Sequence, residues 1–226
     1  MAGSKHRRGR SGEERIVSPR VARKHERNRQ EILQTARAIL RQGGLDAVTL
    51  ASVAGELGLT KQALYHYFPS KEALVRSLVV TLLEEEIEAL AAAIAHEESD
   101  TRVLGAMIRA FYTHYIGRLD AFRAVYCQPQ LHPASSTIID EDALRDDINP
   151  RTRGLFDALE ARLAGASRNK AERARMRRLA FTAWLSALGL LTMLGLAEAT
   201  RDRLLHSDED LLDTLAGAFD EAAAGR

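Results

Sequence analysis

The chain has 226 residues, enough for one large domain or for a small domain followed by a medium-sized one. Hydrophobic residues make up 46% of the sequence and charged residues 28%, a balance typical of soluble globular proteins. The one cysteine, Cys127, excludes an intrachain disulfide. No apolar stretch follows the basic N-terminal residues, so the sequence predicts no secretory signal and we expect a cytoplasmic protein.

The charge is distributed unevenly along the chain. Residues 1–30 contain ten Lys and Arg against three Glu, a net charge of +7, whereas the remaining residues have a net charge of −6. A basic end on an acidic body suggests that this end faces a polyanion, although a solvated tail without a partner has the same composition. Residues 1–24 are rich in Gly, Ser, Arg and Glu, which predicts a disordered basic arm.

From residue 25 onward nearly every segment has the periodicity of an amphipathic helix. The first helix is expected over about 26–42, ending at Gly43 and Gly44. Neither alternating β-branched residues nor Asn-Gly or Asp-Gly turns occur, so we predict an all-α fold. Later helices are expected from Ser70 to near His96, around 103–115 and 122–126, from Asn149-Pro150, over about 170–199 and from Ser207, with a loop at Pro129 and Pro133.

Residues 49–74 have the pattern of a helix-turn-helix. Thr49 is placed to cap a two-turn helix that Gly58 ends, and Thr60 to cap a second short helix that stops at Pro69. The residue types suit a small core beneath a polar second helix. We expect Val53, Ala54, Leu57, Leu59 and Leu64 to be buried, and Lys61, Gln62, Ala63, His66 and Tyr67 to face outward, toward base edges and phosphates.

Two lysines in this segment break a local rule. Lys61 and Lys71 would each occupy the first position of a helix, next to the positive end of its dipole, which is unfavourable by roughly 0.3–1 kcal/mol each. A phosphate bound at each helix N-terminus would reverse the sign of both effects. Two solvated lysines are the simpler alternative.

This segment closely resembles the tetracycline-repressor (TetR) family over about residues 25–80. Val, Leu and Thr replace the family's Ile, Val and Ser at positions 53, 59 and 60. The resemblance implies an N-terminal three-helix DNA-binding domain over 25–70 and a C-terminal helical ligand-binding and dimerisation domain over 71–226. The matching residues are Thr49, Val53, Ala54, Gly58, Leu59, Thr60, Leu64, Tyr65, Tyr67, Phe68, Lys71 and Leu74.

By position, the resemblance also implies the contacts with double-stranded operator DNA. Tyr65 could instead pack partly in the core of so small a domain. The basic residues Arg20, Arg23, Lys24 and Arg27, ahead of the first helix, would follow the DNA backbone or enter the minor groove. Lys61, Gln62 and Ala63, with His66 beside them, would face the major groove, and Thr49, Thr60, Tyr65, Tyr67 and Lys71 would contact phosphates.

The resemblance further implies a homodimer held together by the last two long helices. Residues 179–197 are apolar all round the helix, as expected at such an interface, with Leu188 and Leu191 among the interface positions. The same stretch follows a basic segment and is long enough to span a bilayer. A membrane-anchored DNA-binding regulator is therefore the alternative.

For a small-molecule effector, the sequence provides composition but not shape. Arg109, His114 and Cys127 are the polar candidates, and His114, His132 and His206 share no metal-ligand spacing, so we predict no metal site. For each apolar candidate, ordinary core packing is favoured over ligand binding. These candidates are Met107, Phe111, Tyr112, Tyr115, Phe122, Tyr126, Phe156, Phe181, Trp184 and Met193.

An enzyme on a helical scaffold is the least supported class. The sequence contains no G-x-S-x-G, G-x-x-x-x-G-K-[ST], G-x-G-x-x-G or H-E-x-x-H motif, and we expect no cofactor. The sequence thus predicts a ligand-responsive transcription regulator, expected to be a repressor. It would bind a palindromic operator as a homodimer and respond to a small-molecule effector whose identity the residues do not specify.

Overall fold

The computed structural model of the chain describes residues 19–128, 142, 144–201 and 204–225, and these residues form helices without a strand, which confirms the all-α prediction. The elements are α1 (Pro19–Ala47), α2 (Leu50–Glu56), α3 (Lys61–Tyr65), α4 (Lys71–His96), α5 (Val103–Tyr115), α6 (Leu119–Phe122), π-helical turns at Arg123–Cys127 and Leu144–Ile148, α9 (Asn149–Ala164), α10 (Lys170–Thr200) and α11 (Asp208–Ala223).

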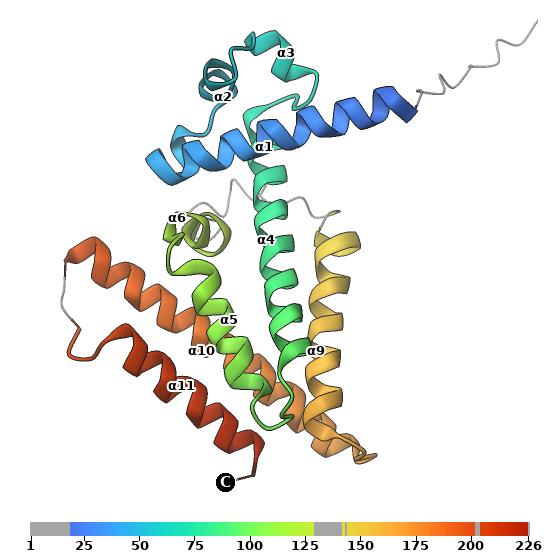
Figure 1. Ribbon diagram of the computed structural model, residues 1–226, viewed down its shortest axis with the longest axis vertical. Helices are drawn as coiled ribbons and strands as arrows, with labels where there is room; N and C mark the ends of the chain where they lie inside the picture. Colours follow the sequence, from blue (N-terminus) through green and yellow to red (C-terminus); the bar gives the residue numbers. More distant parts are fainter. Residues whose placement is uncertain (1–18, 129–141, 143, 202–203, 226) are drawn as a thin grey trace, which may run out of the picture.

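Helices α1, α2 and α3 form a small head at one end of the molecule, and α4 leads from the head into a larger body (Figure 1). One face of α1 packs on α2 and α4, and α2 packs on α3. The buried side chains of the head are apolar, so burial holds these short helices together. They include Ile32, Leu33, Ala36, Leu40, Val53, Ala54, Leu64 and Phe68.

Helix α1 begins earlier than the sequence predicts. Residues 19–24, which we expected within the disordered arm, form its first turns. Pro19 stands at the first helical position, where its missing N–H is not needed, and the Arg, Ala and Lys residues that follow have good helix propensity. Near the other end Gly44 leaves the helical conformation with φ of 70°, at the predicted stop. Residues 1–18 of the expected arm lie outside the described residues.

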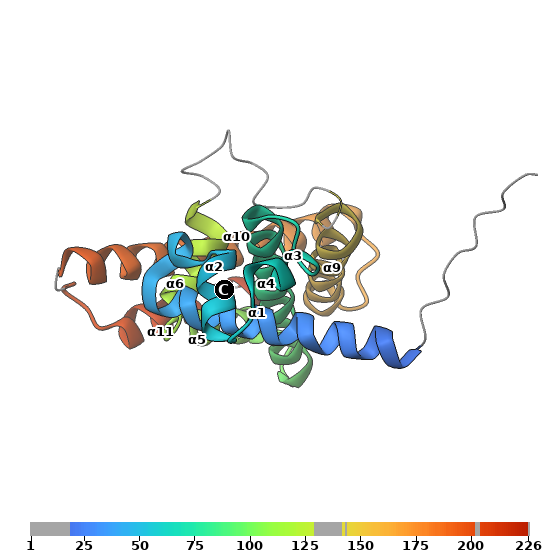
Figure 2. The same cartoon turned by 90° about the horizontal axis from the view of Figure 1, so that it is seen from above.

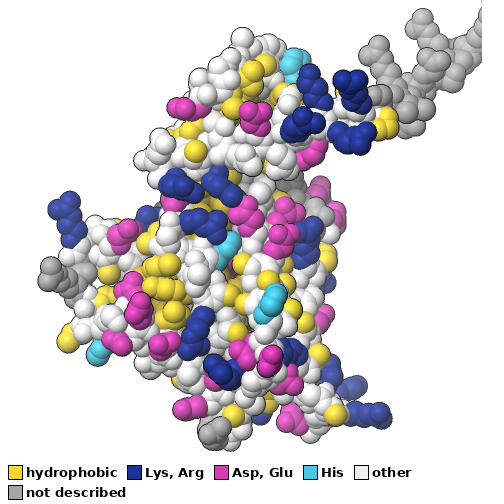
Figure 3. Space-filling view, in the orientation of Figure 1, with side chains coloured by type: hydrophobic (Ala, Val, Ile, Leu, Met, Phe, Trp, Pro, Cys, Tyr) yellow, Lys and Arg dark blue, Asp and Glu magenta, His cyan; other side chains and the backbone are white. Residues whose placement is uncertain are grey.

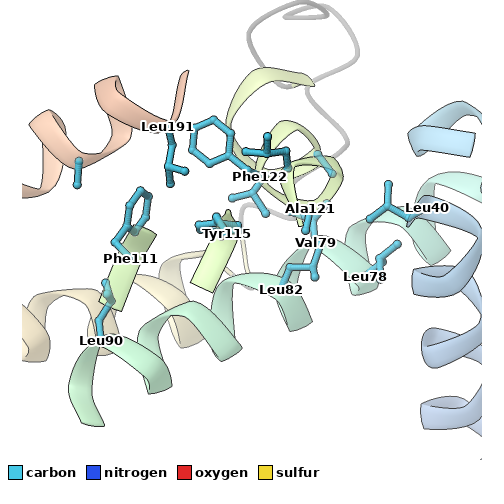
Figure 4. Packing of buried hydrophobic residues seen from close by; sticks show 14 of the residues in the cluster. Leu40, Leu78, Val79, Leu82, Leu90, Phe111, Tyr115, Ala121, Phe122 and Leu191 are labelled. Atoms are coloured by element: carbon cyan, nitrogen blue, oxygen red, sulfur yellow. The ribbon is translucent and has the colours of Figure 1, made fainter. Parts of the chain in front are cut away.

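In the body, α5 packs against α4 on one side and against α10 and α11 on the other, and α9 packs against α4 and α10 (Figures 1 and 2). Side chains from α4, α5, α6 and α10 meet in its core (Figure 4). Leu40 of α1 lies beside Leu78 of α4 in the same view, so the cores of head and body are continuous. The labelled core residues include Leu82, Leu90, Phe111, Tyr115, Phe122 and Leu191.

Helix α10 has two different apolar faces. Ala180, Ala183, Ala187, Leu191 and Leu194 are buried inside the body. Leu191 is therefore a core residue of the protomer and not an interface residue. The prediction for Leu191 was wrong because an all-round apolar sequence does not tell which face of the helix packs internally. The opposite face leaves Phe181, Leu185, Met193 and Leu196 exposed by 46%, 45%, 52% and 54%. Among the described helices, α10 has the length and apolar composition needed to cross a membrane.

Caps at the later helices agree with the sequence in part. Ser207 caps α11 by accepting a hydrogen bond from the Asp210 N–H at 3.1 Å, as predicted. Asn149 does not act as a cap, because the π-helical turn at Leu144–Ile148 continues directly into α9. Pro150 still stands in the first turn of α9. The loop expected at Pro129 and Pro133 lies outside the described residues.

The N-terminus of α5 is capped by a residue from the other end of the chain. No side chain of its own segment caps α5. Instead, Asp220 of α11 accepts a hydrogen bond from the Gly105 N–H at 2.8 Å. A Cβ on Gly105 would lie 2.4 Å from Asp220 Oδ2. The missing side chain at position 105 thus lets α11 approach α5 closely.

We predict that Gly105→Ala lowers the free energy of unfolding by about 1–3 kcal/mol, because the new methyl group must displace the Asp220 carboxylate. Gly154→Ala is the matched control, since Gly154 is exposed within α9 and a Cβ there meets no atom within 4 Å. That control should raise stability by about 0.5–1 kcal/mol through helix propensity. Urea unfolding followed by circular dichroism measures both, and equal effects of the two variants would contradict the tertiary cap.

Candidate DNA-binding and effector sites

The two short helices of the head are set by local capping. Thr49 Oγ1 accepts a hydrogen bond from the Ser52 N–H and Ser52 Oγ accepts one from the Thr49 N–H, both at 3.0 Å, which forms a capping box. Thr60 Oγ1 accepts from the Ala63 N–H at 3.2 Å. Gly58 between the helices has φ of 64°, in the left-handed region. The predicted caps and turn are confirmed.

Helix α3 presents polar side chains to solvent. Lys61, Gln62 and His66 are exposed, and Ala63 is half-buried. Tyr65, for which a partly buried position was the alternative, is 40% exposed, and Lys61 Nζ lies 5.8 Å from the centre of its ring. Hydrogen-bonding side chains on an exposed short helix can reach base edges, because a helix fits the major groove of B-DNA.

Two head residues lie differently from the prediction. Leu59, expected in the core, is 45% exposed. Its N–H bonds to the Ala54 carbonyl oxygen at 2.9 Å in the turn after α2, and this turn leaves the side chain at the surface. Tyr67, expected to face outward, is half-buried against α1. Its ring stacks on His25 with centroids 4.7 Å apart, and its hydroxyl accepts a hydrogen bond from Asn28 at 2.8 Å.

The residues expected to contact phosphates gather at the starts of helices. Thr49, Thr60 and Lys71 stand at the N-terminal ends of α2, α3 and α4. Ser70 caps α4 through the Ala73 N–H at 3.2 Å, and Lys71 Nζ donates to the Asp46 carbonyl oxygen at 3.4 Å. Free N–H groups and the helix dipole make such ends favourable places for a phosphate.

Charged side chains join the head to the body. Glu85 of α4 pairs with Arg37 of α1 at 2.5 Å and with Arg118, which follows α5, at 3.6 Å. Arg118 Nε also donates to the His114 carbonyl oxygen at 2.9 Å. Burial, and then the neighbouring Arg118, lower the pKa of His114 to about 4, against the opposite effect of Glu85. We call Arg37, Glu85, His114 and Arg118 the head–body joint.

The next residue of α4, Glu86, is buried in the core of the body with 4% of its surface exposed. Its carboxylate accepts hydrogen bonds from the hydroxyls of Tyr115, at 2.6 Å, and Tyr126, at 2.6 and 2.8 Å. Burial raises the pKa of Glu86, and hydrogen bonds from Tyr115, Tyr126 and Trp184 oppose that rise. The carboxyl group is therefore held by neutral donors in an aromatic environment.

Sequence reasoning missed Glu86, because it belongs to a run of glutamates that is typical of a solvated helix face. A signal was nevertheless present in its register. Glu86 continues a row in which every fourth residue of α4 is buried, and the other members of that row are Leu74, Leu78, Leu82, Leu90 and Ile94.

Several of the expected effector residues form one cluster around Glu86. The rings of Phe111, Tyr115, Phe122 and Tyr126 contact one another with centroids 5.3–6.4 Å apart. Trp184 extends this aromatic cluster, with its ring 6.1 Å from Tyr126. Aromatic groups around a few converging polar atoms have the composition of a small-molecule site.

The remaining apolar candidates lie around this cluster. Phe156 and Phe181 contact Trp184 with centroids 6.4 and 5.6 Å away, and both line an open groove of about 710 Å³ between α9 and α10. Met107 is fully buried and Met193 is exposed. Tyr112 is half-buried, and burial together with Asp208 and Glu209 raises its pKa.

The polar candidates have other surroundings. Arg109 is exposed and pairs with Asp213 of α11 at 3.0 Å, and His114 belongs to the head–body joint. Cys127 is half-buried, and burial raises the pKa of its thiol. Across the described residues, no three His, Cys, Asp or Glu side chains come together as a metal site. His132 lies outside the described residues.

A capped, exposed short helix on a three-helix head, joined by one long helix to a helical body, defines a helix-turn-helix DNA-binding protein. Residues 32–78 match the model described as "Bacterial regulatory proteins, tetR family". Over these residues, which lie in the head and the start of α4, the chain is similar to this family of regulators.

Curated relatives match this chain over different shares of its length. The uncharacterized HTH-type transcriptional regulator YfiR of Bacillus subtilis is 32% identical over 82 residues, which cover 36% of this chain and 40% of that protein. The nucleoid occlusion factor SlmA of Shewanella baltica is 26% identical over 157 residues, 68% of this chain and 70% of its own. The match thus spans less than half of the YfiR relative.

Solved structures share the fold of most of the chain. A TetR/AcrR-family regulator from Thermobifida fusca has a TM-score of 0.62 at 19% identity, covering 86% of this chain and 97% of its own. FadR from Bacillus subtilis, in complex with stearoyl-CoA, has a TM-score of 0.56 at 17% identity, covering 86% and 96%. At these identities, the likeness concerns the fold.

We predict that the protein loses stability as the pH falls from about 6.5 toward 4 because of His114. The unfolded chain takes up a proton on this residue below its ordinary pKa of 6.5, whereas the folded protein does so only near 4. His114→Asn should therefore reduce the slope of unfolding free energy against pH in this window. Urea unfolding at several pH values measures it.

Because the pKa of Glu86 is raised, this residue changes the free energy of unfolding in the opposite direction as the pH falls. Glu86 is present in both the wild type and the His114→Asn variant, so its contribution cancels when their slopes are compared. Thr113→Asn, at an exposed position of α5 next to His114, is the control and should keep the wild-type slope, because it removes no titratable group. The same slope in all three proteins would refute the assignment to His114.

Proposed function

We propose that the protein is a transcription repressor that binds a palindromic operator as a homodimer and releases or retains it in response to a small-molecule effector. The observation that carries this proposal is the exposed polar surface of α3 on a capped helix-turn-helix. Lys61, Gln62 and His66 would contact base edges in the major groove, with Ala63 beside them. Thr49, Thr60, Tyr65 and Lys71 would contact phosphates, and the Tyr67 hydroxyl would do so while bonded to Asn28.

The exposed face of α10 supports the homodimer. Phe181, Leu185, Met193 and Leu196 form a stripe along one face of this helix, and large apolar side chains in such a row mark an interaction surface. Pairing α10 and α11 with the same helices of a second copy would cover the stripe. This arrangement also accounts for the apolar composition of α10 without a membrane, and we propose a cytoplasmic location.

We propose that the effector binds at the aromatic cluster around Glu86. Tyr115, Tyr126 and Trp184 already converge on its carboxylate, so a ligand that takes over one of these hydrogen bonds would displace a ring. Glu85 is adjacent on α4 and pairs with Arg37 of the head. A ligand-induced shift of α4 would thus alter the spacing of the two α3 helices, provided that the ligand binds one conformation more tightly than the other.

Selection from random duplex DNA is the test of this function. We expect enrichment of an imperfect palindrome whose half-sites lie one helical turn, roughly 34–36 Å, or a multiple of it apart. Gln62→Ala should weaken binding by about 1–3 kcal/mol and relax preference at one base position, because it removes a base-edge contact. Lys71→Ala should weaken all sequences similarly and reduce the salt slope by about 0.9.

Gln34→Ala is the control for Gln62, since Gln34 is exposed on α1 outside the helix-turn-helix. It should leave affinity and sequence preference unchanged. Enrichment of no sequence, or of half-sites without symmetry, would reject the proposed function. A Gln62 variant with unchanged base preference would reject the placement of α3 in the major groove.

We predict that Leu185→Glu combined with Met193→Glu gives a folded monomer without operator binding, because a charge buried in the dimer interface has no partner. Leu205→Glu is the matched control, since Leu205 is 97% exposed between α10 and α11 and should leave the dimer intact. Sedimentation velocity at micromolar concentration measures both. A monomeric wild type contradicts the dimer, and a wild type that stays in solution only with detergent favours the membrane alternative.

A further inference from the structure

The first turns of α1 carry a basic row on one side of the helix. Arg20, Arg23, Lys24 and Arg27 follow one another at spacings of three, one and three, which places them on one helical face, and all four are exposed. The neighbouring Glu26 lies on another face of the helix, and its carboxylate accepts a hydrogen bond from Gln30 at 2.8 Å. Among the described residues, no acidic side chain forms an ion pair with the basic row.

The basic row is unfavourable for the helix by itself. Arg20 and Lys24 form a like-charged pair four residues apart, and so do Arg23 and Arg27. Such pairs destabilise a helix in the absence of an anion. Since the segment is helical nonetheless, an external anion would strengthen it.

Contacts farther along α1 fix the basic row relative to the recognition helix. The His25 ring stacks on Tyr67 at 4.7 Å, and Asn28 donates to the Tyr67 hydroxyl at 2.8 Å. The Arg29 guanidinium lies 5.3 Å from the centre of the Phe68 ring. Tyr67 and Phe68 come two and three residues after the last residue of α3, so α1 is held close to the C-terminal end of the proposed DNA-reading helix.

The direction of α1 places the basic row at the outside of the proposed dimer. Its N-terminal end lies on the side of the molecule opposite to α11 in both views (Figures 1 and 2). Lys and Arg side chains gather around this end of α1 on the visible surface (Figure 3). If α10 and α11 pair across a two-fold axis, the two basic rows point away from that axis, beyond the half-sites.

We propose that the basic row of α1 binds the phosphate backbone of duplex DNA immediately outside each operator half-site. This inference rests on the proposed operator-binding dimer. A helix is roughly 10–12 Å across and the minor groove roughly 6 Å wide, so the helical row cannot enter that groove as an extended arm could. The basic row therefore contacts phosphates from outside the groove and does not distinguish between base sequences.

The test compares a long duplex, carrying the selected palindrome and about one helical turn of flanking DNA on each side, with the palindrome alone. We expect wild type to bind the long duplex at least about tenfold more tightly near physiological salt. Changing Arg20, Arg23, Lys24 and Arg27 together to Ala should remove this difference. On the long duplex it should reduce the slope of log affinity against log salt by about 0.9 for each lost contact.

The matched control changes Arg153, Arg168, Lys170 and Arg175 to Ala. All four are exposed in the body, and the control alters the net charge of the chain by the same amount. It should keep both the preference for flanking DNA and the salt slope. Alanine favours helix, and circular dichroism should show full helicity for both variants.

The outcomes separate this inference from the proposed function. If wild type binds the palindrome but gains nothing from flanking DNA, the inference is overturned and the operator function stands. If wild type binds no palindrome, the proposed function itself fails. If the basic-row variant keeps its DNA binding but loses binding to phosphatidylserine vesicles that wild type shows, the row serves a membrane surface and the inference is wrong.

Discussion

Helix α4 is a single rigid element that belongs to two hydrophobic cores. Near its N-terminus Leu74 and Leu78 pack with the head, where Leu78 lies beside Leu40 of α1 (Figure 4). Farther along, Leu82, Glu86 and Leu90 are buried in the body. Because close-packed cores resist small displacements, a shift of α4 in the body moves the head as well. The head and the body are therefore mechanically linked through α4.

The polar groups of α4 concentrate at the level where this linkage is made. Glu85 connects α1 to Arg118, and Glu86 holds the hydroxyls of Tyr115 and Tyr126 on the inner side of the same helix. A buried carboxyl group that loses a hydrogen-bond donor is destabilised by about 1–3 kcal/mol. The cluster around Glu86 thus opposes rearrangement unless an incoming group replaces the donor that leaves. This property suits the proposed response to a small molecule, in which the protein must remain in one state until a ligand binds.

The helical start of α1 changes the physical character of the basic N-terminal region. A disordered arm has to lose conformational entropy when it binds DNA, and this loss offsets part of the electrostatic attraction. Residues 19–27 already form a helix that His25 and Asn28 attach to Tyr67. Preorganised charges therefore bind with less entropy loss than the same charges on a flexible tail.

The sequence by itself determined the features that depend on neighbours a few residues apart. Thr49, Thr60, Ser70 and Ser207 each cap the N–H three residues ahead, and Gly58 takes the positive φ that ends α2, so these positions were predictable. The helix-turn-helix was recognisable for the same reason. The placement of its phosphate and base contacts stays a prediction.

Only the tertiary structure decided which of several compatible faces is buried. Glu86 lies in the core because Tyr115 and Tyr126, distant in sequence, bring their hydroxyls to it. Leu191 faces the protomer core and Leu185 the solvent, although both belong to the same all-apolar helix. Asp220 caps α5 across more than a hundred residues of chain. Burial and long-range hydrogen bonding depend on which helices meet in space, and local sequence patterns carry no information on that.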